Sequence, residues 1–222
     1  MTRVAVFDMN ETTIDFAPVR AEIDRLFDST DGFTVWFQKL LQMAMTSISS
    51  GAYQPFGVLA PSALDSVAVA RNTTLPPDAW STVAAAMAGV DPFPDVVDGL
   101  TQLRSAGWMT VALTNSAASS INAQVDRAGL RPFFDEVISV DEVQCYKPSP
   151  TPYRHALDKV GADPGDAWMV ASHDWDLAGA RSVGMRTAFV RRPHMIYGSA
   201  YPASDIAVDD FVQLAQTLGM AD

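Results

Sequence analysis

Near its start the sequence reads Val4-Ala5-Val6-Phe7-Asp8-Met9-Asn10-Glu11-Thr12-Thr13-Ile14-Asp15, a short apolar run followed by mostly polar residues. The run 4–7 is rich in β-branched residues and contains neither Pro nor Gly, which predicts a buried strand. Open α/β sheets bind their ligands at the carboxyl ends of such strands, where Asp8 stands. We therefore predict that Asp8 is a nucleophile and that Asn10 determines which leaving group it displaces. An ordinary turn, capped by Asn10 and Thr12, is the alternative.

The composition is that of a globular protein with no nucleic-acid or membrane partner. Of its 222 residues, 48% are hydrophobic and 18% are charged, which supplies a core and excludes a disordered chain. The net charge of −11 disfavours nucleic acid and anionic membranes, although a small anionic substrate needs only a locally positive pocket. Cys145 is the single cysteine, so no intramolecular disulfide is expected. No signal segment opens the chain, and no apolar run approaches the roughly 18–20 residues that cross a bilayer, so we expect a soluble, cytoplasmic protein.

Helical periodicity dominates the chain after the opening turn. The expected helices are 17–27, 33–48, 62–71 and 78–88. The Pro- and Gly-containing segment 49–61 is expected to be a loop. Because no convincing strand is found in this block, we predict an inserted helical domain at residues 17–91. The remaining segments, 1–16 and 92–222, are expected to form one core domain.

Strands and helices alternate from residue 95 onward. The expected strands are 109–113, 136–140, 168–171, 187–190 and 206–208. The expected helices are 96–106, 119–128, 152–160, 177–183 and 211–218. Such alternation predicts a parallel sheet with right-handed crossovers, so the fold class is α/β, of the doubly wound type.

Polar clusters follow three of the expected strands, and a lysine precedes one of the helices. The clusters are Asp8/Asn10/Thr12, Thr114/Asn115 and Ser172/His173/Asp176, and the lysine is Lys147. Because the ends of parallel strands share one edge of a sheet, these groups are expected to converge. Each also has a simpler interpretation: Thr114 as a helix cap, Lys147 as a solvated side chain and Asp176 as a charge at a helix N-terminus. A Lys147–Asp176 ion pair that only ties two loops together is a further alternative.

The order of these clusters resembles the haloacid dehalogenase superfamily. Residues 7–12 resemble its nucleophile motif, 113–116 its second, 146–148 its third and 170–176 its fourth. The helical block resembles the inserted cap domain of that superfamily. Segment 140–144, Tyr153 and Trp175-Asp176 are similar to the L-2-haloacid dehalogenase (type II) branch. The resemblance covers essentially the whole chain and implies a Rossmann-like hydrolase core.

Two departures from the phosphatases of this superfamily bear on the chemistry. Those phosphatases resemble one another in an aspartate two residues after the nucleophile, which protonates the leaving group. Asn10 stands there and cannot act as a general acid. They also need Mg²⁺, and Ser172 occupies the position of a metal-binding aspartate. A hard, octahedral Mg²⁺ site is weakened by the loss of a carboxylate, and Asp174, two residues along, replaces it only in part.

A halide needs neither a proton nor a metal to leave, so we expect metal-independent dehalogenation of a small 2-haloacid with no cofactor. Asp8 attacks C2 and expels halide, and water then hydrolyses the aspartyl ester. Lys147, held by Asp176, keeps Asp8 ionised, while Thr12 and Thr114 bind the substrate carboxylate. The predicted catalytic residues are Asp8, Thr12, Lys147, His173 and Asp176. The predicted substrate-binding residues are Asn10, Phe37, Gln38, Phe56, Thr114, Asn115, Tyr153, Ser172 and Trp175.

Other departures concern the halide. Members of the branch resemble each other in an arginine on the first long cap helix that receives the halide. Phe37 stands at that position, beside a matching Gln38. His173 replaces an asparagine, and three roles are open to it: binding halide as an imidazolium, acting as a base in ester hydrolysis, or packing as a structural histidine.

Two other functions are retained as alternatives. One is a Mg²⁺-dependent small-molecule phosphatase of the same superfamily, and the other is a non-catalytic protein that binds an anion. The expected partner is a small anionic organic substrate, and the branch implies a homodimer. The sequence leaves open the substrate, the halogen, the stereochemistry and the group that receives the halide.

Overall fold

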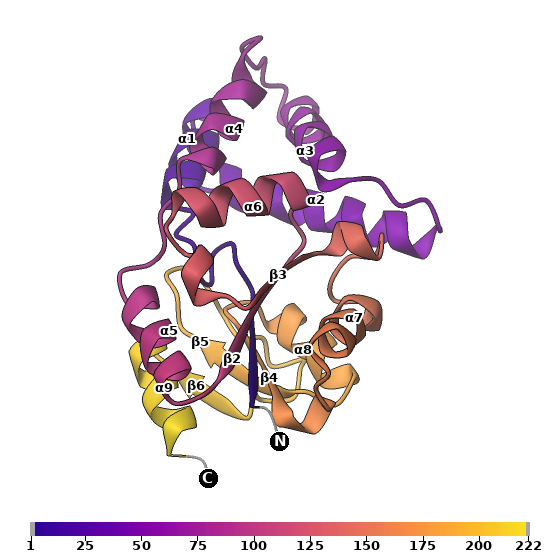
Figure 1. Ribbon diagram of the computed structural model, residues 1–222. Coiled ribbons are helices and arrows are strands. Elements are labelled where there is room, and N and C mark those ends of the chain that lie inside the picture. The colour runs from indigo at the N-terminus through magenta and orange to yellow at the C-terminus, as the bar shows by residue number, and fades with distance from the viewer. Residues whose placement is uncertain (1–2, 221–222) are drawn as a thin grey trace. The chain divides into compact units, whose positions relative to one another are not determined.

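The structure is a computed structural model that describes residues 3–220. The chain divides into two compact units. We call Phe16–Val90 the helical unit, and Met1–Asp15 together with Asp91–Asp222 the sheet unit. Figure 1 labels most of the helices and strands of both units.

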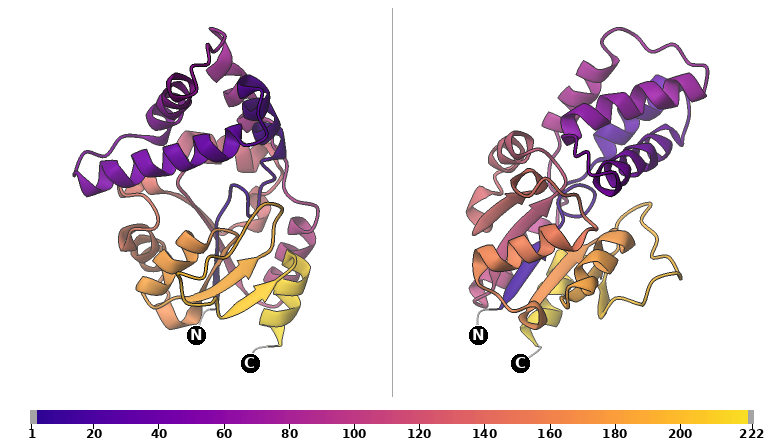
Figure 2. Two further views of the ribbon diagram at one scale, coloured as in Figure 1. Left: turned by 180° about the vertical axis from the view of Figure 1, so that it is seen from behind. Right: turned by 90° about the vertical axis from the view of Figure 1, so that its right-hand side faces the viewer.

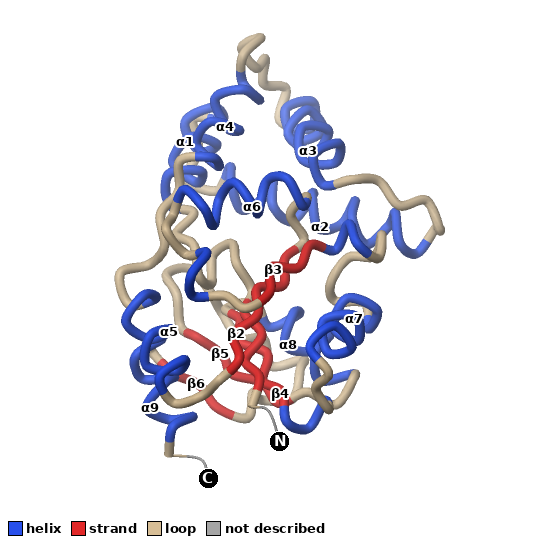
Figure 3. The backbone as a smooth tube through the Cα atoms, in the orientation of Figure 1, coloured by secondary structure: helices blue, strands red, loops and turns tan. Residues whose placement is uncertain are grey.

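The sheet unit contains a six-stranded parallel sheet with the order β3-β2-β1-β4-β5-β6, which confirms the predicted fold class. Its strands are β1 (Val4–Phe7), β2 (Met109–Thr114), β3 (Glu136–Ser139), β4 (Ala167–Ala171), β5 (Arg186–Val190) and β6 (Ile206–Val208). The opening strand therefore lies between β2 and β4, near the middle of the sheet, whose strands are drawn in red in Figure 3. The strand order reverses next to β1, and such a switch point is where doubly wound sheets bind ligands.

Helices cover both faces of this sheet. They are α5 (Val96–Ser105), α6 (Ala118–Arg127), α7 (Pro150–Val160), α8 (Asp174–Ser182) and α9 (Phe211–Gly219). The views in Figures 1 and 2 agree that α5 and α9 lie together and that α7 and α8 lie together. Short 3₁₀ turns at Arg131–Phe133, Val140–Glu142 and Pro164–Asp166 complete the connections.

The alternation of side chains along β1 divides its residues between two cores. Val4 and Val6 belong to an apolar cluster with Leu157 of α7 and Leu177 of α8. Phe7 points to the other face, where its ring stacks on Phe211 of α9 with 5.3 Å between centroids. Because successive strand residues face opposite sides, both faces of β1 are buried, as its uninterrupted apolar run predicts.

The helical unit consists of α1 (Ala17–Phe27), α2 (Gly32–Ser49), α3 (Phe56–Ala70) and α4 (Ala79–Ala88). Helix α2 packs on α1 and α3, and α1 packs on α4. Trp36 of α2 is buried and its indole N–H donates to the Ala60 carbonyl at 3.0 Å, which ties α2 to α3. Within residues 3–220, none of the helices of either unit is long and apolar enough to cross a membrane.

Two boundary predictions were wrong by three residues or more. Segment 49–61 was expected to be a loop, but α3 begins at Phe56 and contains Pro61. The helix tolerates this proline because the missing N–H leaves only the carbonyl of the exposed Gly57 without its helical partner, and water can reach it. Helix α8 begins at Asp174 rather than at residue 177, so Asp176 lies in its first turn.

Candidate active site

The register of the sheet brings three strand ends together around Asp8. Phe7 pairs with Ala112 on β2 and with Val170 on β4, and the Asp8 backbone N–H donates to the Val170 carbonyl at 3.0 Å. Asp8 is therefore flanked by the ends of both neighbouring strands. The predicted convergence of the polar clusters in the sheet unit is confirmed by the contacts that follow.

Lys147 is the centre of the charge network. Its Nζ lies 2.9 Å from Asp8 Oδ1 and 2.6 Å from Asp176 Oδ2, and it donates to the Leu113 carbonyl at 2.9 Å. All three of its ammonium donors are thus satisfied. The lysine side chain is fully buried, which removes the interpretation of Lys147 as a solvated residue.

The polypeptide around Lys147 is fixed to the second motif through Asn115. The Lys147 backbone N–H donates to Asn115 Oδ1 at 2.9 Å, and the Asn115 amide donates to the Lys147 carbonyl at 3.3 Å. Asn115 is therefore a clamp for the lysine-bearing loop, a role different from the expected substrate contact. Because both bonds are buried, this loop has little freedom to move the ammonium group away from Asp8.

Asp176 and Tyr153 form a second layer behind the lysine. The Tyr153 hydroxyl contacts Asp176 Oδ1 at 2.5 Å and the Asp176 carbonyl at 3.0 Å. Both side chains are buried, and the tyrosine also belongs to the apolar cluster of the sheet. Tyr153 was expected to bind substrate. The structure instead places its hydroxyl on Asp176, so Tyr153 positions the carboxylate that holds Lys147.

These contacts separate the pKa values of the buried groups. Burial by itself raises the pKa of Asp8, but the charges of Lys147 and His173 outweigh it and hold that pKa far below its usual range. Burial and the nearby Asp8 charge raise the pKa of Asp176 against the opposing effect of Lys147. Burial favours neutral Lys147, but the two carboxylates outweigh it and raise the lysine pKa. Asp8 is thus held in its ionised form.

Thr12 connects the opening turn to the fourth motif. Its hydroxyl donates to Asp8 Oδ2 at 2.9 Å and accepts the Ser172 backbone N–H at 2.9 Å. The expectation that Thr12 binds a substrate carboxylate is corrected by this geometry, because its one proton is committed to Asp8. Thr13 also supports the nucleophile, since its hydroxyl donates to the Asp8 carbonyl at 2.7 Å.

His173 lies on the opposite side of Asp8 from Lys147. Its Nδ1 is 3.0 Å from Asp8 Oδ2, and its Nε2 is 3.4 Å from Glu11 Oε2. Burial alone lowers the pKa of His173, but its bonds to the two carboxylates outweigh this and raise the pKa to about 9. Trp175 packs beside the imidazole with 5.1 Å between ring centroids.

Several predicted residues line the same turn without contacting Asp8. The Asn10 amide donates to Ser116 Oγ at 3.0 Å, and Thr114 Oγ1 accepts the Ser116 backbone N–H at 3.1 Å. Two buried polar atoms, Asn10 Oδ1 and Ser172 Oγ, have no hydrogen-bond partner within residues 3–220. These atoms are available to a bound substrate or water molecule.

The residues present do not fit a Mg²⁺ site. Ser172 offers a hydroxyl where a carboxylate would be required, and Asp174 turns elsewhere to accept the backbone N–H groups of Trp175 at 2.7 Å and Gly198 at 2.9 Å. The suggestion that Asp174 replaces the missing carboxylate is therefore wrong. Among residues 3–220, no group of three or more His, Cys, Asp and Glu side chains is arranged to hold a metal ion.

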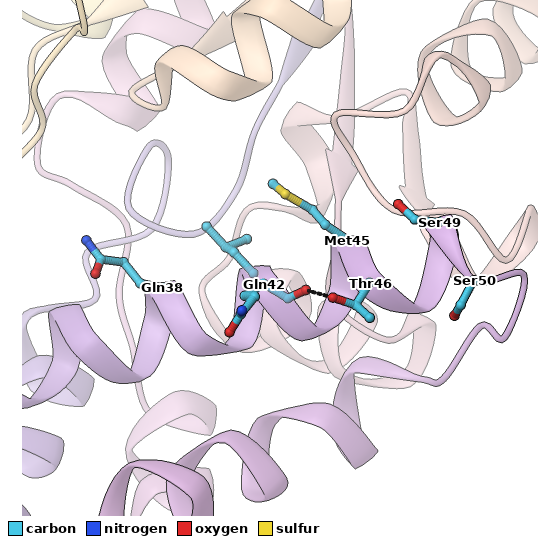
Figure 4. Close-up of a pocket in the computed structure, with 7 residues that line it drawn as sticks. Gln38, Gln42, Met45, Thr46, Ser49 and Ser50 are labelled. Atoms are coloured by element: carbon cyan, nitrogen blue, oxygen red, sulfur yellow. Dashed lines mark hydrogen bonds between the residues drawn. The ribbon is translucent and has the colours of Figure 1, made fainter. Parts of the chain in front are cut away.

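Three predicted residues lie in the helical unit. Gln38 and Phe37 are on α2, and Phe56 begins α3. A hollow of about 650 Å³ runs along α2, lined by Gln38, Leu41, Gln42, Met45, Thr46, Ser49 and Ser50 (Figure 4). Of the three predicted residues only Gln38 lines it, and Phe37 instead stacks on Phe33 with 5.8 Å between centroids.

Sequence reasoning missed two residues of this region. Glu11 contacts His173. In the sequence it stands among turn residues, and its charge is the only signal that could have marked it as a site residue. Arg192 donates to the Thr12 carbonyl at 3.0 Å and to both carboxylate oxygens of Asp95 at 2.8 and 2.9 Å. An arginine 180 residues from Thr12 carries no local signal of that contact.

A family model for haloacid dehalogenase-like hydrolases matches residues 2–184. The chain belongs to this family. It is 31% identical over 193 residues to an (S)-2-haloacid dehalogenase of Pseudomonas sp. (strain YL), covering 86% of this chain and 83% of that protein. It is 26% identical over 197 residues to a haloacetate dehalogenase of Moraxella sp. (strain B), covering 88% and 86%. The solved L-2-haloacid dehalogenase of Xanthobacter autotrophicus superposes with a TM-score of 0.88 at 25% identity, covering 100% of both chains.

Proposed function

We propose that this hydrolase removes halide from a small 2-haloacid through an ester on Asp8. The observation that carries the proposal is the buried contact of Asp8 with Lys147, at 2.9 Å, while Asn10 stands where a general acid would be needed. A carboxylate kept anionic next to a residue that cannot deliver a proton is suited to a leaving group that departs as a stable anion.

In the first step an oxygen of Asp8 attacks C2, and the carbon–halogen bond breaks with its electron pair on the halide. Lys147 keeps Asp8 ionised before the attack, and Asp176 keeps Lys147 in place. In the second step water adds to the Asp8 carbonyl carbon, and the ester bond breaks to release the 2-hydroxy acid. The similarity to (S)-2-haloacid and haloacetate dehalogenases supports this substrate class.

The helical unit is proposed to act as the cap of this enzyme, with boundaries near residues 17 and 91. Gln38, Phe37 and Phe56 are its proposed contributions to substrate binding, on the basis of the family resemblance. In the sheet unit, the unpartnered Asn10 Oδ1 and Ser172 Oγ support contacts to the bound acid. Thr114 and Trp175 complete the proposed substrate-binding set. Homodimer formation and a cytoplasmic location stay predictions.

A Mg²⁺-dependent phosphatase is the second candidate, because the fold is shared with a solved phosphatase of the superfamily, with a TM-score of 0.67. The donor set argues against it, since Ser172 and Asn10 replace the metal ligand and the proton donor. A protein that only binds an anion is disfavoured by the charge network, because binding does not require a carboxylate held next to a cation.

One experiment separates these functions. The protein is incubated with 2-chloropropionate, 2-bromopropionate, chloroacetate and an aryl phosphate, each with and without EDTA, while halide and phosphate release are assayed. We expect halide release that survives EDTA and disappears in Asp8→Asn. Phosphate release that EDTA abolishes would contradict the proposal, and the absence of both products would favour the anion-binding protein.

A further inference from the structure

The imidazole of His173 is held between two carboxylates, with Nδ1 at 3.0 Å from Asp8 Oδ2 and Nε2 at 3.4 Å from Glu11 Oε2. An ionised carboxylate only accepts hydrogen bonds, so each ring nitrogen has to carry a hydrogen to satisfy its neighbour. Only the imidazolium does so at both positions. The contacts therefore select the charged form of His173 in the free protein.

Glu11 is placed for this contact by the backbone of the opening turn. Its φ is +61°, in the left-handed region that a residue other than glycine rarely adopts. The turn is fixed by the Glu11 N–H, which donates to the Ile14 carbonyl at 2.9 Å, and by the Ile14 N–H, which donates to the Met9 carbonyl at 2.8 Å. The carboxylate of this buried residue thereby faces the His173 ring.

The two oxygens of Asp8 have different surroundings. Among residues 3–220, Oδ1 accepts one hydrogen bond, from Lys147, whereas Oδ2 accepts two, from Thr12 and His173. A carboxylate oxygen has two in-plane lone pairs, so those of Oδ2 are occupied and one of Oδ1 is free. Oδ1 is therefore the oxygen available to attack carbon. Oδ2 stays as the carbonyl oxygen of the ester.

We propose that His173 is a catalytic residue for ester hydrolysis, donating through Nδ1 to Oδ2 of Asp8 as an imidazolium, and that Glu11 is the residue that positions its ring. This inference rests on the proposed function. The second donor is the Thr12 hydroxyl, whose proton is directed at Oδ2 because its oxygen accepts the Ser172 backbone N–H. Together the two donors form an oxyanion hole around Oδ2.

Ester hydrolysis does not require His173 to act as a base. Water adds to Cγ of Asp8, and the carbonyl π pair moves onto Oδ2, where the two donors stabilise it. The pair then returns, the bond from Cγ to Oδ1 breaks, and Oδ1 leaves with the product. One water proton ends on that product hydroxyl. The other is lost to solvent as the restored Asp8 ionises beside Lys147 and His173.

This role fixes the sign of the pH dependence. The charged groups at the ring are Asp8 and Glu11, with the Lys147 ammonium on the far oxygen of Asp8, while Asp174 and Asp176 of α8 engage other partners. The pKa of His173 is about 9 in the free protein. Ester formation removes the Asp8 charge that raises this pKa. Ester hydrolysis is therefore lost as pH rises, with a midpoint below that value.

The test follows one turnover of 2-chloropropionate by rapid quench between pH 6 and 10, using chloride release for ester formation and the mass of the Asp8 peptide for ester decay. The variants are His173→Asn, which keeps a neutral donor, and Glu11→Gln. The surface pair His155–Glu142, with 2.9 Å between Nε2 and Oε2, gives the matched controls His155→Asn and Glu142→Gln.

We expect His173→Asn to slow ester decay by about tenfold and to remove its alkaline loss, because the amide replaces a charged donor with a neutral one and charge-assisted hydrogen bonds are roughly twice as strong. Ester formation is less affected than ester decay, since Lys147 alone keeps Asp8 ionised. Glu11→Gln retains the rate at low pH but moves the alkaline loss to lower pH. The two controls match the wild-type protein in both steps.

Three outcomes overturn the proposal in distinguishable ways. A decay rate that rises with pH in the wild-type protein and loses this rise in His173→Asn would assign His173 as a base. Equal decay in the wild type and His173→Asn would remove it from the step. If the wild-type protein releases no halide and forms no adduct, the proposed function fails and this inference fails with it.

A second measurement requires neither turnover nor a variant protein that folds. In protein labelled with ¹⁵N-histidine, the three histidines give separable ring signals, and the signal of His173 is assigned from its contacts to Trp175. We expect both of its ring nitrogens to be protonated at pH 7.5. A neutral ring at that pH would contradict the proposal independently of any kinetic result.

Discussion

Lys147→Met is the perturbation that most directly probes the charge network. Methionine retains the unbranched apolar stem of lysine and is one atom shorter, so most of the space is filled while the ammonium is removed. Two buried carboxylates, Asp8 and Asp176, then lose the cation that lies between them at 2.9 and 2.6 Å. His173 still faces Asp8, whereas the Asp176 carboxylate retains, within the part of the chain that the structure describes, only the Tyr153 hydroxyl.

The magnitude follows from the burial of the three groups. Removing one partner of a buried ion pair costs about 3–5 kcal/mol, because the remaining charge is left uncompensated. The side chains of Lys147 and Asp176 are both 0% exposed, so solvent cannot replace the lost contact. We therefore expect Lys147→Met to lower the free energy of unfolding at pH 7.5 by about 3–5 kcal/mol.

The loss should depend on pH with a definite sign. Without the lysine, burial and mutual repulsion raise the folded-state pKa of Asp176 above its unfolded value of about 3.9. An acid whose pKa is raised in the folded state is protonated and neutral below that pKa. It destabilises the folded state only as pH rises through that pKa and the buried group becomes charged. The variant is therefore closer to wild type at pH 5 than at pH 7.5.

The assay is urea unfolding monitored by circular dichroism at both pH values. Lys159→Met is the matched control, because Lys159 pairs with Glu142 at 3.1 Å on the surface with 33% of its side chain exposed. Exposed pairs contribute about 0–1 kcal/mol, so this variant should be nearly neutral. If Lys147→Met costs less than about 1 kcal/mol at both pH values, the buried charges are not coupled as inferred.

Three further predictions concern neighbouring groups. Tyr153→Phe should destabilise the protein by about 1.5–3 kcal/mol in urea unfolding, because a charged acceptor on Asp176 loses its donor; an unchanged midpoint would contradict the 2.5 Å contact. Arg192→Met should cost about 3 kcal/mol at pH 7. Burial raises the pKa of Asp95, but Arg192 lowers it more strongly, and stability that comes from a lowered pKa is lost in acid. The destabilisation by Arg192→Met should therefore shrink as pH falls below about 4. A destabilisation that is constant with pH would refute the pairing. Asn10→Asp should confer no EDTA-sensitive phosphatase activity, since Ser172 still lacks a carboxylate; phosphate release by this variant would show that a metal is held by other groups.

The sequence was most informative where chemistry coincides with local structure. Asp8, Lys147 and Asp176 were predicted to converge because each stands at the end of a strand or at a loop on the same edge of the sheet, and the structure joins all three. The predicted bounds of each strand lie within one residue of the observed bounds, because buried parallel strands are short apolar runs bounded by polar residues.

The remainder depended on contacts that leave no local signal. Thr12 and Tyr153 were assigned to the substrate, yet their hydroxyl groups serve Asp8 and Asp176, and hydroxyl direction is set only by tertiary neighbours. Glu11 was overlooked because its contact with His173 requires a left-handed backbone conformation, and a glutamate in the sequence does not indicate that conformation. Likewise, helix α3 begins before Pro61, where the prolines and glycines of segment 49–61 had suggested a loop.

The central claim is that the hydroxyl oxygen of the product first belongs to Asp8. It is tested by a single turnover of 2-chloropropionate, with enzyme in excess, in H₂¹⁸O, followed by mass spectrometry of the product and of the peptide that contains Asp8. We expect an unlabelled 2-hydroxy acid and one ¹⁸O atom in the Asp8 carboxylate. A labelled product with an unlabelled Asp8 would mean that water attacks C2 directly, and it would contradict the ester mechanism.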